Sequence, residues 1–368
     1  MRITAAVVPG EGQPLEMREL ELDDPRPGEV RVRLRASGIC HTDAIVRDQW
    51  YDVPLPAVLG HEGAGVVEAV GDGVTTVAVG DHVVMSFASC GTCRLCLTGH
   101  PAYCATFYEL NFGGRRTDGS TAFTGGDGEA VSSHFFGQSS FATHANVYER
   151  CLVTVPASAP LELLAPLGCG IQTGAGAVLN RLDPPAGSSV VVFGAGAVGL
   201  AAVLAAVVAD ATTIVAVDVV GSRLALAREL GATHTVDPRE EDAVERIREI
   251  TGGGADFALD TTGVPTVFRQ LSDCLGVLGQ GAMVGATTPG TEGTVDIGTT
   301  LLSGQTLHMV IEGDSVPQSF IPRLIDLYEQ GRFPFDRLVR TYDFDAINDG
   351  FADSESGEVL KPVVVFAD

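Results

Sequence analysis

Two short runs near the start of the chain carry side chains that bind transition metals. Cys40 opens the run Cys-His-Thr-Asp, and His61 lies in the later run Gly-His-Glu. A catalytic zinc ion takes three protein ligands of the cysteine and histidine kind and keeps one position open. Cys169, in the run Leu-Gly-Cys-Gly, supplies the third candidate. Each residue alone is more typical of a protein core, but the three together predict a catalytic zinc site.

The residues beside these candidates strengthen the prediction. Asp43 is placed to accept the second ring N–H of His61 and so to fix its tautomer. Glu62 is expected behind the metal, where it would modulate coordination, and Thr42 is placed to take a proton from a bound alcohol. A zinc- and NAD-binding structural or sensor protein would have no need of this hydroxyl. The set therefore favours an enzyme.

Four further cysteines lie close together with the spacing C-x2-C-x2-C-x7-C: Cys90, Cys93, Cys96 and Cys104. Four thiolates so near in sequence suit a closed tetrahedral zinc site that fixes a loop and offers no open position. An iron–sulfur cluster is the alternative, since similar spacings occur there. The spacing predicts structural zinc. Cys151 and Cys274 have no other metal-binding residues at ligand spacing nearby and are expected in the core.

A third pattern predicts a dinucleotide site. Gly194, Gly196 and Gly199 form G-x-G-x-x-G after the apolar strand 190–193 and before an apolar helix. Glycines let the backbone approach a pyrophosphate at the helix N-terminus. Asp218 ends the next expected strand and can bind both ribose hydroxyls, which favours NAD over NADP. Arg223 is a mild counter-argument, although it can also face the adenosine ribose.

The elements needed to position these residues divide the chain into two kinds of structure. Residues 2–84 alternate apolar and polar residues between glycine turns, and strands are expected at 31–36 and 63–71. Residues 107–140 are expected to form a long loop with little regular structure. Strands at 190–193, 213–218, 257–260, 282–285 and 306–310 alternate with helical segments such as 222–230. This predicts an α/β protein with a strand-rich domain and a doubly wound parallel sheet. A helix at 320–330 and a strand at 361–366 follow.

Composition limits the partners. The net charge of −24 and a single lysine, Lys361, exclude nucleic acid and anionic membranes as natural partners. The uncharged run 188–209 has the length of a membrane span, but its glycines indicate a strand-to-helix turn. Eight cysteines without a signal peptide point to thiolate ligands in a reducing compartment, so a cytoplasmic location is expected.

These motifs together resemble the zinc-dependent medium-chain alcohol dehydrogenase family along the whole chain. The resemblance implies a GroES-like catalytic domain over 1–165 and 314–368, with the structural zinc lobe at about 88–106, and a Rossmann NAD domain over 166–313. It also implies two Zn²⁺ per chain and a homodimer or homotetramer joined through the last strands of the coenzyme domains. Cys40, His61 and Cys169 match the family's catalytic zinc ligands, and Thr42 matches its relay hydroxyl. His41 and Lys361 fall where the family contacts the pyrophosphate.

The segments 311–317 and 331–336 look most like the aryl-alcohol (benzyl-alcohol) dehydrogenase branch. This implies NAD-linked, reversible oxidation of small neutral primary alcohols, aromatic or allylic, to aldehydes. Trp50 and Tyr51 are candidates for an aromatic pocket wall. Where many members carry a relay histidine this chain has Ile45, which leaves the final proton acceptor open.

A rival activity stays open. The segment 134–141 also resembles formaldehyde dehydrogenases that act on thiol adducts, and such substrates need cations to hold their carboxylates. Arg115 and Arg116 are the obvious pair.

Overall fold

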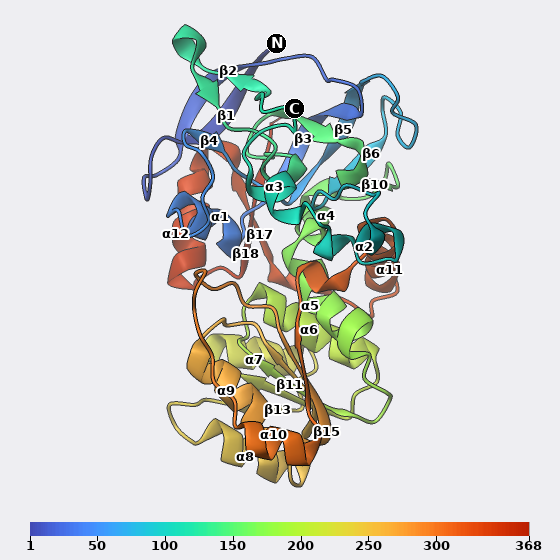
Figure 1. Ribbon diagram of the computed structural model, residues 1–368, viewed down its shortest axis with the longest axis vertical. Coiled ribbons are helices and arrows are strands. Elements are labelled where there is room, and N and C mark those ends of the chain that lie inside the picture. Colours follow the sequence, from blue (N-terminus) through green and yellow to red (C-terminus); the bar gives the residue numbers. More distant parts are fainter. Residues whose placement is uncertain (368) are drawn as a thin grey trace. The chain divides into compact units, whose positions relative to one another are not determined.

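The computed structural model describes residues 1–367 and divides them into two compact units. The first contains Met1–Cys169, Val316–Ile325 and the residues from Asp336 onward, and the second contains Gly170–Ser315 and Asp326–Phe335. Figure 1 shows the strand-rich first unit in blue, cyan, green and red and the second in light green to orange. Among the described residues, no helix has both the length and the apolarity needed to cross a bilayer.

The first unit is built from two sheets. One has the strand order β4-β1-β2-β7-β8, and the other has the order β10-β6-β5-β3-β18-β17 with β9 paired to β3. Their bounds are β1 Arg2–Val8, β2 Glu16–Leu22, β3 Glu29–Gly38, β4 Ala57–Val58, β5 Gly63–Val70, β6 His82–Met85, β7 Phe123–Thr124, β8 Ala130–Val131, β9 His144–Tyr148, β10 Leu152–Val155, β17 Val339–Asp343 and β18 Lys361–Val365. The expected strands at 31–36, 63–71 and 361–366 are therefore confirmed.

The helices of this unit are short. They are α1 His41–Arg47, α2 Arg94–Leu97, α3 Phe107–Phe112, α4 Leu161–Leu164 and α12 Ile347–Ser356. The residues of α11, Pro317–Glu329, are divided between the two units. The expectation of an irregular loop over 107–140 is wrong at its start, because α3 occupies that position. This helix of six residues is too short to show a helical period, and its Phe112 packs against the rings of Tyr51 and Phe135.

The second unit is a parallel six-stranded sheet in the order β13-β12-β11-β14-β15-β16, the doubly wound order of dinucleotide-binding proteins. Its strands are β11 Ser189–Phe193, β12 Thr213–Val217, β13 His234–Val236, β14 Ala255–Asp260, β15 Leu275–Met283 and β16 Thr306–Met309. Its helices are α5 Gly170–Gly176, α6 Ala197–Val208, α7 Gly221–Glu229, α8 Ala243–Thr251, α9 Pro265–Asp273 and α10 Ile297–Ser303.

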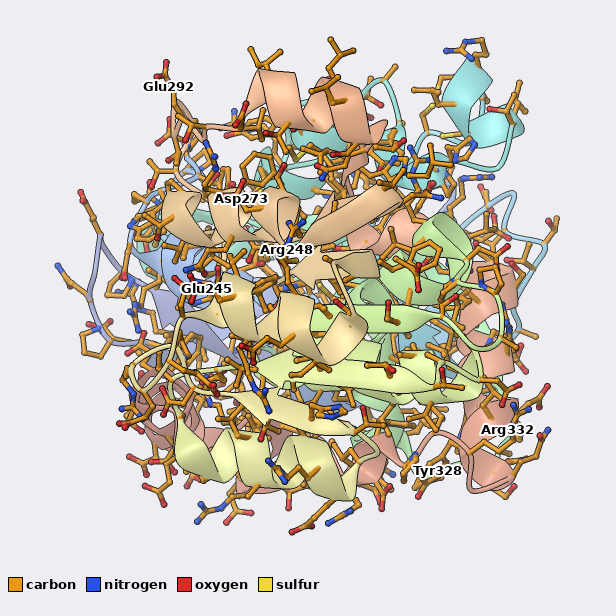
Figure 2. The ribbon with its side chains drawn as sticks, turned by 90° about the horizontal axis from the view of Figure 1, so that it is seen from below. Glu245, Arg248, Asp273, Glu292, Tyr328 and Arg332 are labelled. Atoms are coloured by element: carbon orange, nitrogen blue, oxygen red, sulfur yellow. The ribbon has the colours of Figure 1, made fainter. Side chains whose placement is uncertain are left out.

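Helices cover both faces of this sheet. Figure 2 shows α8, with Glu245 and Arg248, beside the end of α9 at Asp273. A guanidinium nitrogen of Arg248 donates to the carbonyl oxygen of Asp273 at 2.7 Å and joins the two helices. The uncharged run 188–209 is divided between β11 and α6, as its glycines indicated. Cys151 and Cys274 are fully buried, as expected.

Candidate zinc and dinucleotide sites

Three predicted ligands and a carboxylate converge inside the first unit. The ligand atoms of Cys40, His61, Glu62 and Cys169 all lie within 4.8 Å of one another. Cys40 is the N-cap of α1, His61 lies just before β5, and Cys169 ends the first segment of the unit. His61 Nε2 is buried without a hydrogen-bond partner, which is the state expected of a nitrogen that ligates a metal. The donor set fits zinc.

Asp43 forms hydrogen bonds with both the Cys40 segment and the His61 segment. One carboxylate oxygen accepts the Cys40 backbone N–H at 2.9 Å. The other lies 2.9 Å from His61 Nδ1 and also accepts the Gly60 backbone N–H at 3.1 Å. Both Asp43 and His61 are fully buried, so this geometry is fixed. The contact directs Nε2 of the imidazole toward the other ligands, as the sequence predicted for Asp43.

The charges of the site act on its ligands. Hydrogen bonding with Cys169 holds the pKa of Cys40 well below its usual range, and the charges of Lys361 and His61 add to this effect. Burial would lower the pKa of His61, but the carboxylate of Asp43 and the Cys40 thiolate outweigh burial and raise it. A cysteine that ionises readily is a ready metal ligand.

Glu62 and Lys361 form a buried ion pair behind the ligands. Nζ of Lys361 lies 2.9 and 3.0 Å from the two carboxylate oxygens of Glu62 and 3.2 Å from the carbonyl oxygen of Ile39. Gly38 is required here, because a Cβ atom would stand 2.0 Å from Glu62 Oε2. Contact of Lys361 with a pyrophosphate stays a prediction, since the structure directs its ammonium group to Glu62.

The residues next to Cys40 have different surroundings. Thr42 Oγ1 lies 3.8 Å from Cys40 Sγ, while His41 is exposed and contacts the Trp50 ring edge-on at 6.5 Å. Ile45 is 2% exposed, so the position that carries a relay histidine in many family members is apolar and closed to solvent in this chain.

Aromatic side chains surround the imidazole of His61. The ring of Phe136 stacks on it at 4.5 Å and that of Phe135 meets it edge-on at 5.4 Å. Phe112 packs against both phenylalanines and against Tyr51. Sequence reasoning proposed Tyr51 as an aromatic wall but missed Phe135 and Phe136, whose only local signal is the aromatic pair itself.

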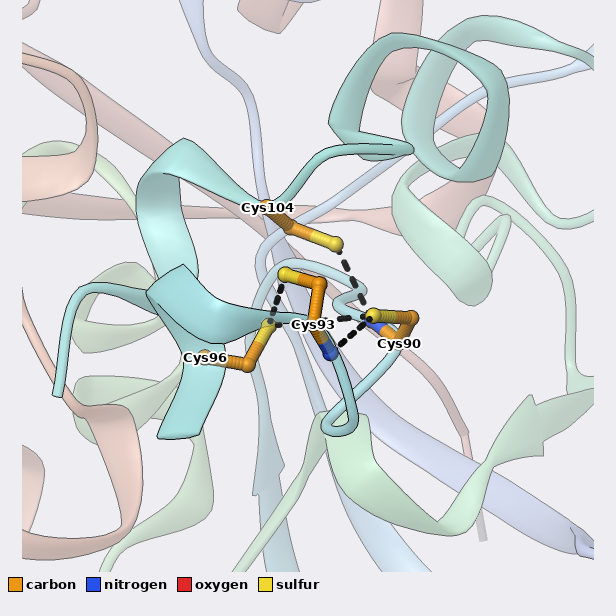
Figure 3. A group of neighbouring side chains, drawn as sticks. All are labelled: Cys90, Cys93, Cys96 and Cys104. Carbon is orange, nitrogen blue, oxygen red and sulfur yellow. Dashed lines mark hydrogen bonds between the residues drawn. The ribbon is translucent and has the colours of Figure 1, made fainter. Parts of the chain in front are cut away.

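The four-cysteine group forms a separate site (Figure 3). The sulfur atoms of Cys90, Cys93, Cys96 and Cys104 all lie within 4.8 Å of one another. Backbone N–H groups of Cys90 and Cys93 point at the sulfurs of Cys104 and Cys90 at 3.2 and 3.3 Å. Hydrogen bonds from the backbone of Thr92 and Cys93 lower the pKa of Cys90 to about 5. Four thiolates and no open position suit a structural zinc ion.

The glycine turn of the second unit is shaped for a phosphate group. Gly194 has a φ of +88°, and a Cβ atom on Gly199 would stand 1.8 Å from the Gly194 carbonyl oxygen. A Cβ atom on Gly196 would meet no atom within 4 Å, so this glycine leaves open space at the N-terminus of α6. Phosphates bind at such helix ends.

The acidic residue expected at the ribose lies beside this turn. The Asp218 carboxylate accepts the backbone N–H of Ala195 at 2.6 Å and that of Val220 at 2.8 Å. Arg223 Nε is buried and has no hydrogen-bond partner. The residues therefore fit a dinucleotide whose ribose hydroxyls would contact Asp218.

The long loop holds Arg116 in a buried ion network. Arg116 is 4% exposed, and its Nε donates to Glu29 at 2.6 Å while Nη1 and Nη2 donate to the carboxylate of Asp23. Arg115 is exposed instead. Arg116 is thus unavailable to a substrate carboxylate, and the cationic pair expected for thiol adducts does not form.

Comparison with known proteins agrees with this geometry. Residues 26–157 match the family model "Alcohol dehydrogenase GroES-like domain" and residues 197–330 match "Zinc-binding dehydrogenase". A geraniol dehydrogenase from Castellaniella defragrans is 48% identical over 98% of this chain and 97% of that protein. The chain therefore belongs to the zinc-dependent medium-chain alcohol dehydrogenase family.

Solved structures extend the comparison over the full length. The benzyl alcohol dehydrogenase of Acinetobacter calcoaceticus is 51% identical with a TM-score of 0.97, and each chain is covered completely. An alcohol dehydrogenase zinc-binding domain protein from Burkholderia ambifaria is 56% identical with a TM-score of 0.98, again over both complete chains. These likenesses confirm the predicted combination of a GroES-like domain and a Rossmann domain.

Proposed function

We propose that this chain is an NAD-dependent alcohol dehydrogenase that converts aromatic or allylic primary alcohols reversibly to aldehydes. The observation that carries the proposal is the convergence of Cys40, His61 and Cys169 beneath an aromatic wall. The similar proteins named for geraniol and benzyl alcohol support this substrate class. The buried position of Arg116 disfavours thiol adducts.

The side chains divide the work of the reaction. Cys40, His61 and Cys169 would hold zinc, a Lewis acid that lowers the pKa of an alcohol when bound. Thr42 would accept the alcohol's proton near Cys40, and Asp43 keeps the imidazole in one tautomer. Because Ile45 is apolar, the proton has to leave by another route, through a ribose hydroxyl or water. The aromatic rings exclude water from the face of the imidazole.

The second unit would supply the coenzyme. Its glycine turn and Asp218 suit NAD, which accepts the hydride when bound. A carboxylate at this position would repel a 2′-phosphate, so we propose NAD rather than NADP. The four-cysteine site would hold a second zinc ion, giving two per chain.

We also propose a homodimer or homotetramer joined through the second unit. Within the described residues β16 ends its sheet, and unpaired edge strands readily add another strand. Nearby apolar side chains are exposed, with Leu301 at 77%, Leu302 at 89% and Met309 at 58%. A second copy of the same surface would bury them.

Initial rates of NADH formation from NAD and of NADPH formation from NADP test the activity. The substrates are benzyl alcohol, geraniol, ethanol, and formaldehyde with and without added thiols. A high kcat/KM for benzyl alcohol or geraniol without thiol is expected. Activity only with formaldehyde plus a thiol would refute the proposal, and so would a preference for NADP.

A further inference from the structure

The segment His134–Ser139 has an unusual backbone. His134, Phe136 and Ser139 have φ values of +60°, +52° and +54°, and Gly137 lies between them at +69°. A left-handed conformation costs a non-glycine residue about 1–3 kcal/mol, and it persists only where the surroundings fix it. All six residues are buried. Three strained residues in so short a stretch call for a physical cause.

Side-chain contacts hold both ends of the segment. His134 Nε2 lies 3.0 Å from Glu29 Oε1, and its Nδ1 lies 2.8 Å from Ser133 Oγ. At the other end, the Ser139 hydroxyl donates to the Val58 carbonyl oxygen at 2.7 Å and accepts the Phe135 backbone N–H at 3.0 Å. These contacts fix the segment against β3 and β4.

Gln138, within the segment, forms hydrogen bonds with the backbone around His61. The Gln138 side-chain amide donates to the carbonyl oxygens of His61 at 2.9 Å and Ser86 at 3.1 Å. Its oxygen accepts the Gly63 backbone N–H at 3.1 Å. The buried side-chain amide of Gln138 therefore binds the backbone on both sides of Glu62 and connects it to the residue that follows β6.

The same segment also fixes the ring of His61. Phe136, one of the three strained residues, stacks on the imidazole with an angle of 29° between the planes, and Phe135 meets it edge-on at 87°. Asp43 already holds Nδ1. The remaining polar atom, Nε2, can then point only toward Cys40 and Cys169.

We propose that His134–Ser139 is a positioning element for the zinc ligand His61, with Gln138 and Phe136 as its positioning residues. The inference rests on the proposed zinc site. The strained backbone of this short segment places two side chains on His61. The amide of Gln138 binds the backbone of His61, and the ring of Phe136 stacks on its imidazole. Groups that orient metal ligands in this way contribute about 10- to 100-fold to metal affinity.

The test uses Co²⁺ in place of zinc, because its visible spectrum reports ligand geometry. Bands that disappear in Cys40→Ser are assigned to the His61 site. Gln138→Met and Phe136→Leu are compared with Phe123→Leu, which shortens an equally buried phenylalanine of β7 in the same unit. Affinity is measured by competition with a chelator, and stability by urea unfolding.

We expect Gln138→Met and Phe136→Leu each to shift the assigned bands and to weaken Co²⁺ binding about 10-fold or more. Phe123→Leu should lose stability but keep the wild-type bands and affinity. The inference is overturned if the two variants keep wild-type bands and affinity, or if Phe123→Leu changes them equally. Gln138→Met and Phe136→Leu are each compared with wild type separately, so if one variant fails to fold the other still tests the proposal. If the wild-type protein binds no metal that Cys40→Ser removes, the proposed function itself fails.

Discussion

Replacement of Glu29 by Gln should destabilise the first unit in a pH-dependent way. Glu29 is 2% exposed and accepts hydrogen bonds from Arg116 at 2.6 and 3.0 Å and from the Arg26 backbone N–H at 2.9 Å. Burial raises the pKa of Glu29, but hydrogen bonds from His134 and Arg116 outweigh it and lower the pKa from 4.5 to about 2. The carboxylate is thus strongly favoured in the folded chain.

The pKa sets the magnitude. One pKa unit corresponds to about 1.4 kcal/mol, so the ionised carboxylate contributes about 3 kcal/mol at neutral pH. Removal of one partner from a buried ion pair costs a similar amount, about 3–5 kcal/mol. Because the folded-state pKa lies below the unfolded value, this contribution is complete above pH 4.5 and is lost as the pH falls toward 2. It should fall to about 1.5 kcal/mol at pH 3.

Urea unfolding of wild type and Glu29→Gln at pH 7, 5, 4 and 3 gives the difference in unfolding free energy directly. We expect the wild-type advantage to be constant from pH 7 to 5 and then to shrink. Glu21→Gln is the matched control, because Glu21 forms an exposed pair with Arg2, and it should change stability by about 0.5 kcal/mol or less. A Glu29→Gln variant as stable as Glu21→Gln, or a difference independent of pH, would refute the reasoning.

Three further outcomes follow from the sites. Asp43→Asn should weaken metal binding at His61 about 10- to 100-fold, measured by chelator competition, and unchanged affinity would contradict the role of Asp43. Cys93→Ser should reduce zinc from two per chain to one and lower the Tm, whereas two retained zinc ions would exclude the cysteine cluster as a zinc site. An amine-acylating reagent should modify Lys361, which is 3% exposed, in urea but not in the folded protein, as mass spectrometry of peptides would show.

Features encoded within a short stretch could be predicted from the sequence. The four-cysteine lobe and the glycine turn were readable because all their parts lie close together in the chain. Cys40, His61 and Cys169 are far apart, so their convergence was predicted from their residue types and neighbouring residues, and the family resemblance then supported it. Glycine marks a positive φ at Gly194, but nothing in the sequence marks the same conformation at Phe136.

The long-range contacts around the candidate zinc site were the least predictable part. The Glu62–Lys361 pair joins residues 299 positions apart, and the bonds from Arg116 to Glu29 span 87 positions. Such pairs depend on which strands become neighbours, and no local period or propensity encodes that choice. Arg115 and Arg116 suggested a cationic site because the sequence does not show that Arg116 is buried in an ion pair. Only the tertiary structure separates the exposed guanidinium from the buried one.

The position of the only lysine in this acidic chain follows from the charge of the ligand group. Two thiolates, Cys40 and Cys169, would balance the charge of one Zn²⁺ held at this site and would leave no positive charge for the carboxylate of Glu62 close beside them. The pKa of Glu62 is raised, because burial outweighs the opposing charge of Lys361. A buried ion pair adds little net stability compared with apolar residues of similar size. The ammonium group of Lys361 therefore offsets the charge that the carboxylate of Glu62 would otherwise bring beside the candidate ligands.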